Sequence, residues 1–218
     1  MHKTLFLTSD INCDKITVNK QTGGIIMVVC VFGASSSKID SDYIKKVEEL
    51  GGELAKNGHS VVFGAGFDGL MGAVARGAKK NGGQTIGIVP QFFIDEKLSD
   101  IFECDELICT DSMHTRKKKM EDLSDAFVIV PGGIGTLEEF FEVLTLKQLC
   151  RHQKPIVLYD INGYYKKLDD FMLNAEKEGF FGANTRSLYK TAATAEEVIR
   201  FIESTEKHSS NVRDLRYS

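Results

Sequence analysis

Two alternating patterns of apolar residues divide this chain into short buried strands and amphipathic helices. Apolar runs rich in β-branched and aromatic residues predict strands at 26–32, 60–63, 85–89, 106–110, 126–130 and 155–159. Between them, apolar residues spaced three or four positions apart predict helices at 41–57, 70–81, 113–123, 137–150, 164–178 and 195–203. Nearly continuous apolar strands that alternate with helices are typical of a parallel sheet covered on both faces. The sequence therefore predicts an α/β fold with a doubly wound, Rossmann-like parallel sheet.

The same pattern predicts one domain at residues 25–205. A polar stretch without periodicity at 1–24 is expected to form a flexible N-terminal arm, and a polar tail follows at 206–218. In a doubly wound sheet the ligand crevice lies outside the carboxyl ends of the strands. Three glycine-containing turns follow predicted strands there, at 32–36, 64–72 and 131–136.

Composition narrows the class of protein. The net charge of -4 argues against a nucleic-acid binder, which would normally show a basic face. The five cysteines are odd in number and form no C-x-x-C pair, which favours free thiols in a reducing compartment over a disulfide framework or zinc site. The longest apolar run, 25–32, is far too short to span a membrane, and the chain starts with no secretory pattern. We expect a soluble, cytoplasmic protein with no nucleic-acid or membrane partner.

The segment 128–139 carries the strongest candidate chemistry. An apolar strand leads into the turn 131–136 (PGGIGT) and then into a helix. Glycines let the backbone approach a ligand closely, and a helix N-terminus offers unpaired N–H groups and a positive dipole end. A strand, a glycine-rich loop and a helix in this order are a common phosphate site. Two carboxylates, Glu138 and Glu139, are predicted in the first turn of the helix, beside the expected anion.

Each carboxylate also has a purely structural interpretation. Thr136 and Glu139 match the S/T-x-x-E capping box, in which the glutamate satisfies donors at a helix N-terminus. Glu138 could simply be a first-turn carboxylate that the helix dipole favours. Both alternatives stay open on the sequence alone.

A second candidate lies in the charged segment 112–120. Met113, Arg116 and Met120 recur at helical spacing, so they share one stripe, and Lys117 borders it. A guanidinium on an apolar stripe requires an anion, because an unpaired buried charge is very costly. That anion is either a structural carboxylate or a ligand phosphate. The neighbouring His114 has no second ligand at metal spacing, so we expect no metal site.

The turn 64–69 fits the dinucleotide fingerprint G-x-G-x-x-G, but only weakly. It follows the second predicted strand instead of the first, and the next strand ends without the carboxylate that would hold a ribose. The alternative interpretation is a tight turn with close helix packing through Gly69 and Gly72.

Together these segments resemble the LONELY GUY (LOG) family, the cytokinin riboside 5′-monophosphate phosphoribohydrolases. The resemblance runs from about residue 28 to about residue 203. Its most specific parts are 131–139 (PGGIGTLEE), which matches PGGxGTxxE, and 113–117 (MHTRK), which matches MHxRK. The segments 69–72 (GLMG) and 160–165 (DINGYY) match further family motifs.

The resemblance implies a hydrolase that cuts the N-glycosidic bond of nucleoside 5′-monophosphates and needs no metal or cofactor. It implies Arg116 and Glu139 as the catalytic pair. It also implies a set of residues that bind the substrate or its phosphate: Gly132, Gly133, Gly135, Thr136, Lys117, Met113, Ser35 and Gly33. Members are often labelled lysine decarboxylases, but no lysine here stands in a recognisable pyridoxal-phosphate context.

The family builds its site beside a two-fold interface, so a homodimer or higher homo-oligomer is expected. The predicted helix 137–150 agrees with this, because Phe140, Phe141, Leu144 and Leu149 spread over more than one of its faces.

Several positions depart from the family pattern. Residues 32–36 read FGASS where plant members commonly have FCGSS, 64–66 read GAG instead of three glycines, and Ser112 replaces the usual aspartate. The register of a substrate-loop glutamate near Glu96 is open. These departures bear on the preferred base more than on the reaction.

Two other functions stay in view. The first is a non-catalytic nucleotide-binding or carrier protein of the same fold, because fold does not fix function. The second is a dinucleotide oxidoreductase, which the missing ribose carboxylate disfavours.

Overall fold

The computed structural model describes residues 26–204, so the expectations for 1–24 and 206–218 lie outside the described part. Seven parallel strands form one sheet in the order β4-β3-β2-β1-β5-β6-β7. The strands are β1 (Val28–Phe32), β2 (Ser60–Phe63), β3 (Thr85–Pro90), β4 (Glu106–Thr110), β5 (Ala126–Ile129), β6 (Ile156–Tyr159) and β7 (Lys190–Ala192). The predicted doubly wound α/β fold is confirmed.

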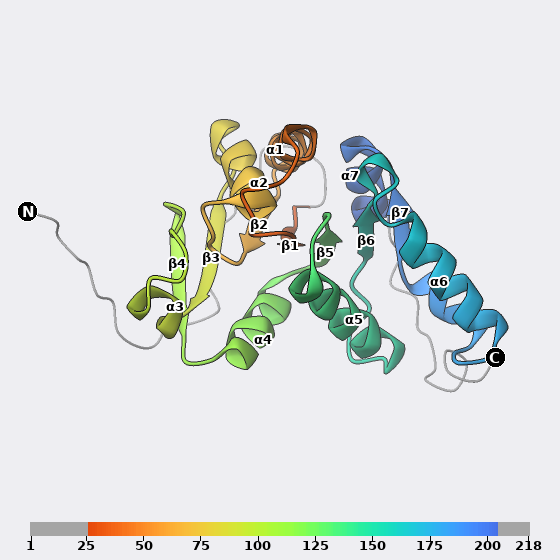
Figure 1. Ribbon diagram of the computed structural model, residues 1–218. Coiled ribbons are helices and arrows are strands. Elements are labelled where there is room, and N and C mark those ends of the chain that lie inside the picture. The colour runs from red at the N-terminus through yellow and green to blue at the C-terminus, as the bar shows by residue number, and fades with distance from the viewer. Residues whose placement is uncertain (1–25, 205–218) are drawn as a thin grey trace, which may run out of the picture.

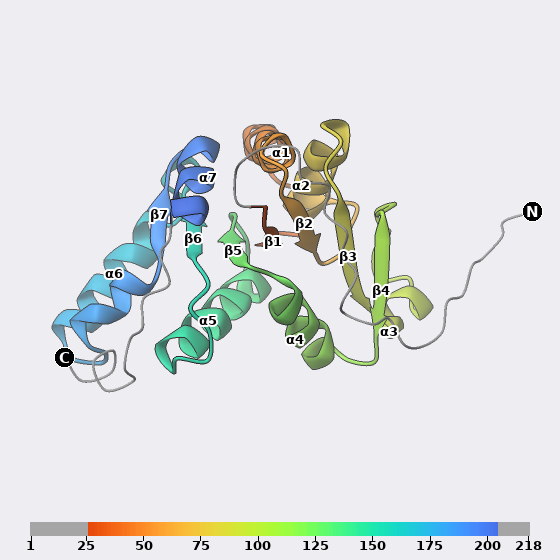
Figure 2. The ribbon, with the colours of Figure 1, turned by 180° about the vertical axis from the view of Figure 1, so that it is seen from behind.

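Helices cover both faces of the sheet. The helices α1 (Ser41–Lys56), α2 (Gly69–Lys80) and α7 (Ala195–Ser204) lie on one side, and α4 (Met113–Leu123) and α5 (Ile134–Gln148) lie on the other (Figure 1). The opposite view shows the same two layers (Figure 2). Helix α6 (Lys166–Lys177) contributes Met172 to the same core as α4 and α5.

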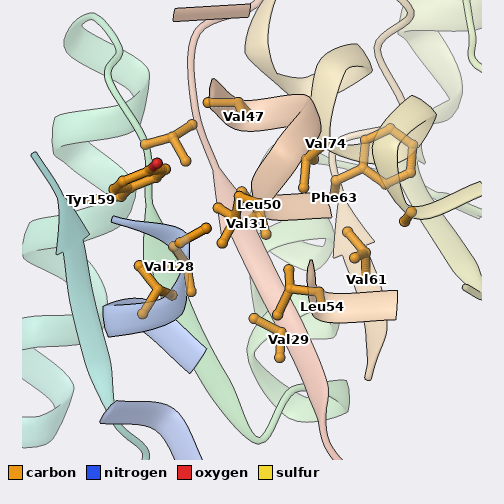
Figure 3. Packing of buried hydrophobic residues seen from close by; sticks show 14 of the residues in the cluster. Val29, Val31, Val47, Leu50, Leu54, Val61, Phe63, Val74, Val128 and Tyr159 are labelled. Carbon is orange, nitrogen blue, oxygen red and sulfur yellow. The ribbon is translucent and has the colours of Figure 1, made fainter. Parts of the chain in front are cut away.

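Alternation along the central strand explains why both faces are apolar. Val29 and Val31 of β1 face α1 and α2, where they join Leu50 and Leu54 in one core (Figure 3). Residues of β1 with the opposite parity join the second core, under α4, α5 and α6: Val28, Cys30 and Phe32. A strand buried on both sides reads as a continuous apolar run, which is why β1 is so clear in the sequence.

The structure adds elements that the sequence pattern did not predict. They are the five-residue helix α3 (Gln91–Asp95), the strand β7, and two 3₁₀ turns, η1 (Ile161–Gly163) and η2 (Ala183–Leu188). Each is too short to show a period, and β7 carries two exposed polar residues, Lys190 and Thr191. Segment β7 is a strand because it pairs with β6 at the edge of the sheet, and its own sequence carries no strand pattern.

The sheet reverses its winding between β1 and β5, which pair with each other. From β1 the chain winds outward to β4, then returns to form β5 on the other side of β1. Two loops therefore diverge at the carboxyl ends of these strands, and the N–H of Ala34 ties them together by donating to Pro131 O at 3.1 Å. A reversal of this kind is where an open α/β sheet places its ligand site.

Within residues 26–204, no helix is both long and apolar enough to cross a bilayer.

Helices α1 and α2 cross so closely that a side chain at the crossing would overlap backbone. A Cβ atom at Gly77 would lie 1.9 Å from the carbonyl oxygen of Glu48. We predict that Gly77→Ala lowers the free energy of unfolding by about 2 kcal/mol or more, although alanine favours a helix by about 1 kcal/mol over glycine. Denaturant unfolding checks this. At Gly52 an added Cβ meets the movable side-chain amide of Asn81, 2.8 Å away, so Gly52→Ala should cost clearly less.

Candidate active site

The loop 130–133 leads from β5 directly into α5. It is called the phosphate loop below, because the sequence predicts a phosphate site there. Gly133 caps the helix without a side-chain hydrogen bond, so the first N–H groups of α5 carry no capping partner from that residue. Gly133 and Gly135 are exposed, and a Cβ at either position would have no heavy atom within 4 Å. The backbone here borders open space, as a cradle for an anion requires.

Thr136 and Gly132 fit against each other behind this open face. Both are buried, and a Cβ at Gly132 would lie 2.1 Å from Thr136 Oγ1. The glycine therefore lets the threonine pack against the loop. The structure brings together all four residues predicted for the cradle, with two of them facing outward and two inward.

Glu139 lies one turn deeper than predicted. Helix α5 begins at Ile134 instead of Leu137, so its first turn contains no acidic residue. The predicted capping box is wrong, because Thr136 is already inside the helix and no side chain caps it. The dipole interpretation of Glu138 as a first-turn carboxylate is wrong for the same reason. Two glycines flanking an apolar residue hid the true start of the helix.

Arg116 on α4 is the partner of Glu139. Both residues are nine-tenths buried, and Arg116 Nη1 lies 3.5 Å from Glu139 Oε1. Arg116 Nε also donates to the carbonyl oxygen of Ile88, in the carboxyl-terminal half of β3, at 3.2 Å. Of the two anions left open by the sequence, the structure provides the carboxylate.

Burial dominates the electrostatics of this pair. Desolvation raises the pKa of Glu139 to about 7, although the charge of Arg116 opposes the shift. The carboxylate therefore titrates near neutral pH, where a group can take up and release a proton most effectively. A carboxyl with a strongly raised pKa beside the predicted anion cradle is a candidate for the acid or base of an active site.

Gly64 makes room for the guanidinium. A Cβ at this position would lie 2.1 Å from Arg116 Nη2. Gly64 directly follows β2 and begins the turn to α2, so residues at the carboxyl-terminal sides of β2 and β3 contribute to the placement of Arg116, which itself follows β4. The sequence showed Gly64 only as part of a weak fingerprint. The Ile88 carbonyl gave no sequence signal, because any residue supplies one.

Lys117 points to α5 as well. Its ammonium contacts Glu138 and lies 2.8 Å from Glu142 Oε2. Burial disfavours its charge, but these two contacts outweigh burial and raise the pKa of Lys117. Lys117 is thus paired with carboxylates of α5.

The remaining predicted residues of α4 divide between core and surface. Met120 is fully buried, whereas Met113 is 38% exposed with its sulfur 4.0 Å from Arg116 Nη1. Ser112 caps the helix by accepting a hydrogen bond from the N–H of Thr115. Serine at this position therefore performs the capping that the family's aspartate could provide.

The loop after β1 lies beside the phosphate loop. Gly33 is buried, and a Cβ there would lie 2.3 Å from Val130 Cγ2, while Ser35 is exposed. Glu96 is an exposed residue that directly follows α3.

The dinucleotide fingerprint has a structural role. The first donors of α2 are already used, because the N–H of Leu70 donates to Ala34 O at 2.8 Å. Gly69 has a φ of +61°, and a Cβ at Gly72 would lie 1.7 Å from Phe67 O. Tight turning and close packing therefore explain these glycines.

Within residues 26–204, no group of three or more His, Cys, Asp or Glu side chains is placed to hold a metal ion. The described thiols Cys30, Cys104 and Cys109 are free.

Comparison with known proteins identifies the family. A family model described as "Possible lysine decarboxylase" matches residues 71–202. The cytokinin riboside 5′-monophosphate phosphoribohydrolase LOG4 of Arabidopsis thaliana is 38% identical over 175 residues, which cover 80% of this chain and 81% of the relative. The probable cytokinin riboside 5′-monophosphate phosphoribohydrolase LOGL5 of Oryza sativa subsp. japonica is 40% identical over 172 residues, covering 78% and 69%. This chain belongs to the LOG family.

Two solved structures share the fold of this chain. TM1055 is 25% identical, with a TM-score of 0.61, and the match covers 81% of this chain and 98% of the other. The molybdenum cofactor binding protein of Rippkaea orientalis also has a TM-score of 0.61, with 24% identity and coverage of 84% and 98%. The second likeness shows a shared fold and nothing of ligand or activity.

We predict that Gly64→Ala impairs catalysis more than folding. The added methyl group would overlap the Arg116 guanidinium, which the hydrogen bond to Ile88 O holds close to Gly64. The guanidinium must therefore move away from its position. If Arg116 acts in catalysis as the family resemblance implies, the expected result is a fall in kcat of at least about tenfold, since small misplacements of catalytic groups are costly, with little change in Tm. Gly66→Ala in the same turn is the control, because its Cβ would approach only the terminal methyl of Met71, at 3.1 Å. Equal activity of the two variants would contradict this role of Gly64.

Proposed function

We propose that this LOG-family chain hydrolyses the N-glycosidic bond of nucleoside 5′-monophosphates, such as cytokinin riboside 5′-monophosphate or AMP, to free base and ribose 5-phosphate. The observation that carries the proposal is the buried Arg116–Glu139 pair beside the open phosphate loop. The names of the closely similar relatives support the same substrate class.

In this proposal the 5′-phosphate binds at Gly133, Gly135 and the N-terminus of α5. Its binding energy holds the ribose near Glu139, which lies about one and a half turns into the same helix. The phosphate-binding and reacting positions are thus parts of one rigid element.

Glu139 supplies the carboxylate. As the bond to the base breaks, positive charge grows on the sugar, as in glycoside hydrolysis. An ionised Glu139 stabilises that charge or removes a proton from the attacking water. A pKa of about 7 keeps a large part of the enzyme in this form at neutral pH.

Arg116 positions the carboxylate and balances its charge. Its Nη1 at 3.5 Å from Glu139 leaves room for a shorter contact when substrate fills the site. Because Ile88 O and the space at Gly64 fix the guanidinium, little reorganisation is needed during the reaction.

Two other activities find less support. A decarboxylase that used pyridoxal phosphate would need a lysine with a lowered pKa at the site, whereas the pKa of Lys117 is raised. Burial lowers the pKa of Lys147 to about 8, but Lys147 lies in the last turn of α5, at the end of the helix away from the phosphate loop. A carrier would need only the cradle, and the buried charged pair would then have no use.

The free thiols Cys30, Cys104 and Cys109 agree with a reducing, cytoplasmic environment.

The 5′-phosphate should be required for turnover. We expect kcat/KM for AMP to exceed that for adenosine by about a hundredfold or more, because the phosphate contributes charge-assisted hydrogen bonds at the cradle. Release of free base from AMP, a prenylated AMP and adenosine measures this. Equal kcat/KM values for AMP and adenosine would refute the proposal, and tight binding of AMP without turnover would favour a carrier.

Substitutions of Glu139 and of Glu138 should have clearly different effects on kcat. We expect Glu139→Gln to lower kcat by about 10²-fold or more, on the scale of lost acid–base catalysis. Glu138→Gln is the matched control. It removes one half-exposed partner of Lys117, and Glu142 remains, so kcat should stay within about threefold. Thermal unfolding verifies that both variants fold.

The pH dependence tests the same assignment. Because the ionised form of Glu139 is the active one, kcat should rise with pH and level off above about 7. A limb near pH 6 that persists in Glu139→Gln would instead report the substrate phosphate, whose second pKa lies near 6.

We further propose that the chain is a homodimer. An apolar groove lies between α5, α6 and η2, and its lining includes Phe141, Leu144, Phe171, Phe180 and Phe181. Phe171 is 63% and Phe180 82% exposed, which is unusual for aromatic side chains unless a partner covers them. The sequence predicted that apolar residues spread over more than one face of α5. In the structure, Phe140 faces the core and Phe141 faces the groove.

Sedimentation velocity at micromolar concentration tests the assembly. We expect a dimer for the wild type and a shift toward monomer for the double variant Phe171→Ser with Phe180→Ser. Leu107→Ser is the control, because Leu107 is 44% exposed at the far edge of the sheet, on β4. A monomeric wild type would refute the dimer.

A further inference from the structure

The phosphate loop uses every one of its carbonyl groups. Val130 O accepts from Tyr165 Oη at 2.8 Å and Gly132 O accepts from Tyr164 Oη at 2.7 Å. Pro131 O accepts from the N–H of Ala34 at 3.1 Å, and Gly133 O from the N–H of Leu137 at 3.0 Å. Two of these four acceptors are held by the hydroxyls of adjacent tyrosines.

A trans peptide unit is planar, so its C=O and its N–H point in opposite directions. The described residues contain no cis peptide bonds. When Tyr164 draws the Gly132 carbonyl toward itself, it therefore turns the N–H of Gly133 the other way. Gly133 is the cap of α5 and borders open space.

The peptide between Gly132 and Gly133 has little intrinsic preference for this orientation. Both flanking residues are glycines, which permit the paired changes in ψ and φ that flip a peptide unit. A flipped unit would present a carbonyl oxygen to the cradle, where it would repel an anion. One hydrogen bond from Tyr164 opposes that flip.

We infer that Tyr164 is a positioning residue, whose hydroxyl holds the 132–133 peptide so that the Gly133 N–H faces the substrate phosphate. The inference rests on the proposed function for the identity of that ligand.

The surroundings of Tyr164 fix its ring. Its ring packs edge-on against Tyr43 of α1, with centroids 6.2 Å apart, and against Tyr165 at 5.0 Å. Asn162, in the turn before it, accepts from Lys46 Nζ at 2.7 Å and donates to Asp42 Oδ2 at 2.8 Å. The N-terminal part of α1 thus anchors the turn. Although Tyr164 is 46% exposed, its hydroxyl donates its hydrogen bond to a backbone carbonyl instead of to water.

Tyr165 makes the same kind of bond without the same consequence. Its hydroxyl holds the carbonyl of Val130, and the next residue, Pro131, has no N–H to orient. Tyr165 is 2% exposed, so its hydroxyl satisfies a buried acceptor. The chain therefore provides its own matched control.

Tyr164→Phe and Tyr165→Phe are compared in the full-length protein. Binding of inorganic phosphate and of ribose 5-phosphate is measured by calorimetry, and kcat and KM are measured with AMP. We expect Tyr164→Phe to weaken both ligands about tenfold, the scale of one lost hydrogen bond, and to raise KM more than it lowers kcat. Tyr165→Phe should change binding less than about twofold and lower Tm more.

The amide resonance of Gly133 gives a readout that a general loss of stability would not move. In the wild type it should shift on addition of phosphate, in Tyr165→Phe it should shift equally, and in Tyr164→Phe the shift should be reduced. Equal losses of binding in both variants, unchanged binding in Tyr164→Phe, or a wild type that binds neither ligand would overturn the inference. Absence of AMP hydrolysis with the expected binding pattern would instead refute the proposed function and leave the role of Tyr164 standing.

Discussion

The carboxylate of Glu139 and the guanidinium of Arg116 lie next to each other in a largely buried part of this protein, and the structure around them has to accommodate both charges. Arg116 without Glu139 would be an uncompensated charge, and Glu139 without Arg116 would lose the charge that limits its rise in pKa. At 3.5 Å between Arg116 Nη1 and Glu139 Oε1, the two groups form an ion pair, so neither charge is buried without a partner.

The sheet topology brings together the three groups of this site: the two charged side chains and the backbone carbonyl that holds Arg116. Glu139 comes from the helix after β5, Arg116 from the helix after β4, and the Ile88 carbonyl from β3. All lie toward the carboxyl ends of parallel strands, where open α/β folds gather their functional groups. Because each group stands on a regular element packed against the core, the site is built mostly from rigid parts.

The phosphate loop shows a second way in which the fold serves chemistry. A loop that must present N–H groups to an anion has to direct its carbonyls elsewhere. Here donors from the neighbouring loop, the first turn of α5 and the Tyr164 hydroxyl hold the carbonyls of Pro131, Gly133 and Gly132. The Tyr165 hydroxyl satisfies the buried carbonyl of Val130, which has no N–H beside it to orient. The same fold in the Rippkaea orientalis protein belongs to a molybdenum cofactor binding protein, so the fold by itself does not determine which ligand fills such a crevice.

The sequence by itself determined the fold class, the six longer strands and the place of the cradle, because apolar periodicity and glycine turns are local signals. It also singled out Arg116 as needing an anion, since a charge on an apolar stripe must be paired. It could not choose between a carboxylate and a ligand, and it misplaced the start of α5, because glycine is a poor helix former and Thr136 mimicked a cap. Strand β7 and the spatial roles of Gly64, Ile88 and Tyr164 depend on contacts between segments far apart in the chain. Only the tertiary structure decided these, because such a contact leaves no period or spacing in the sequence and exists only once the sheet brings its strand ends together.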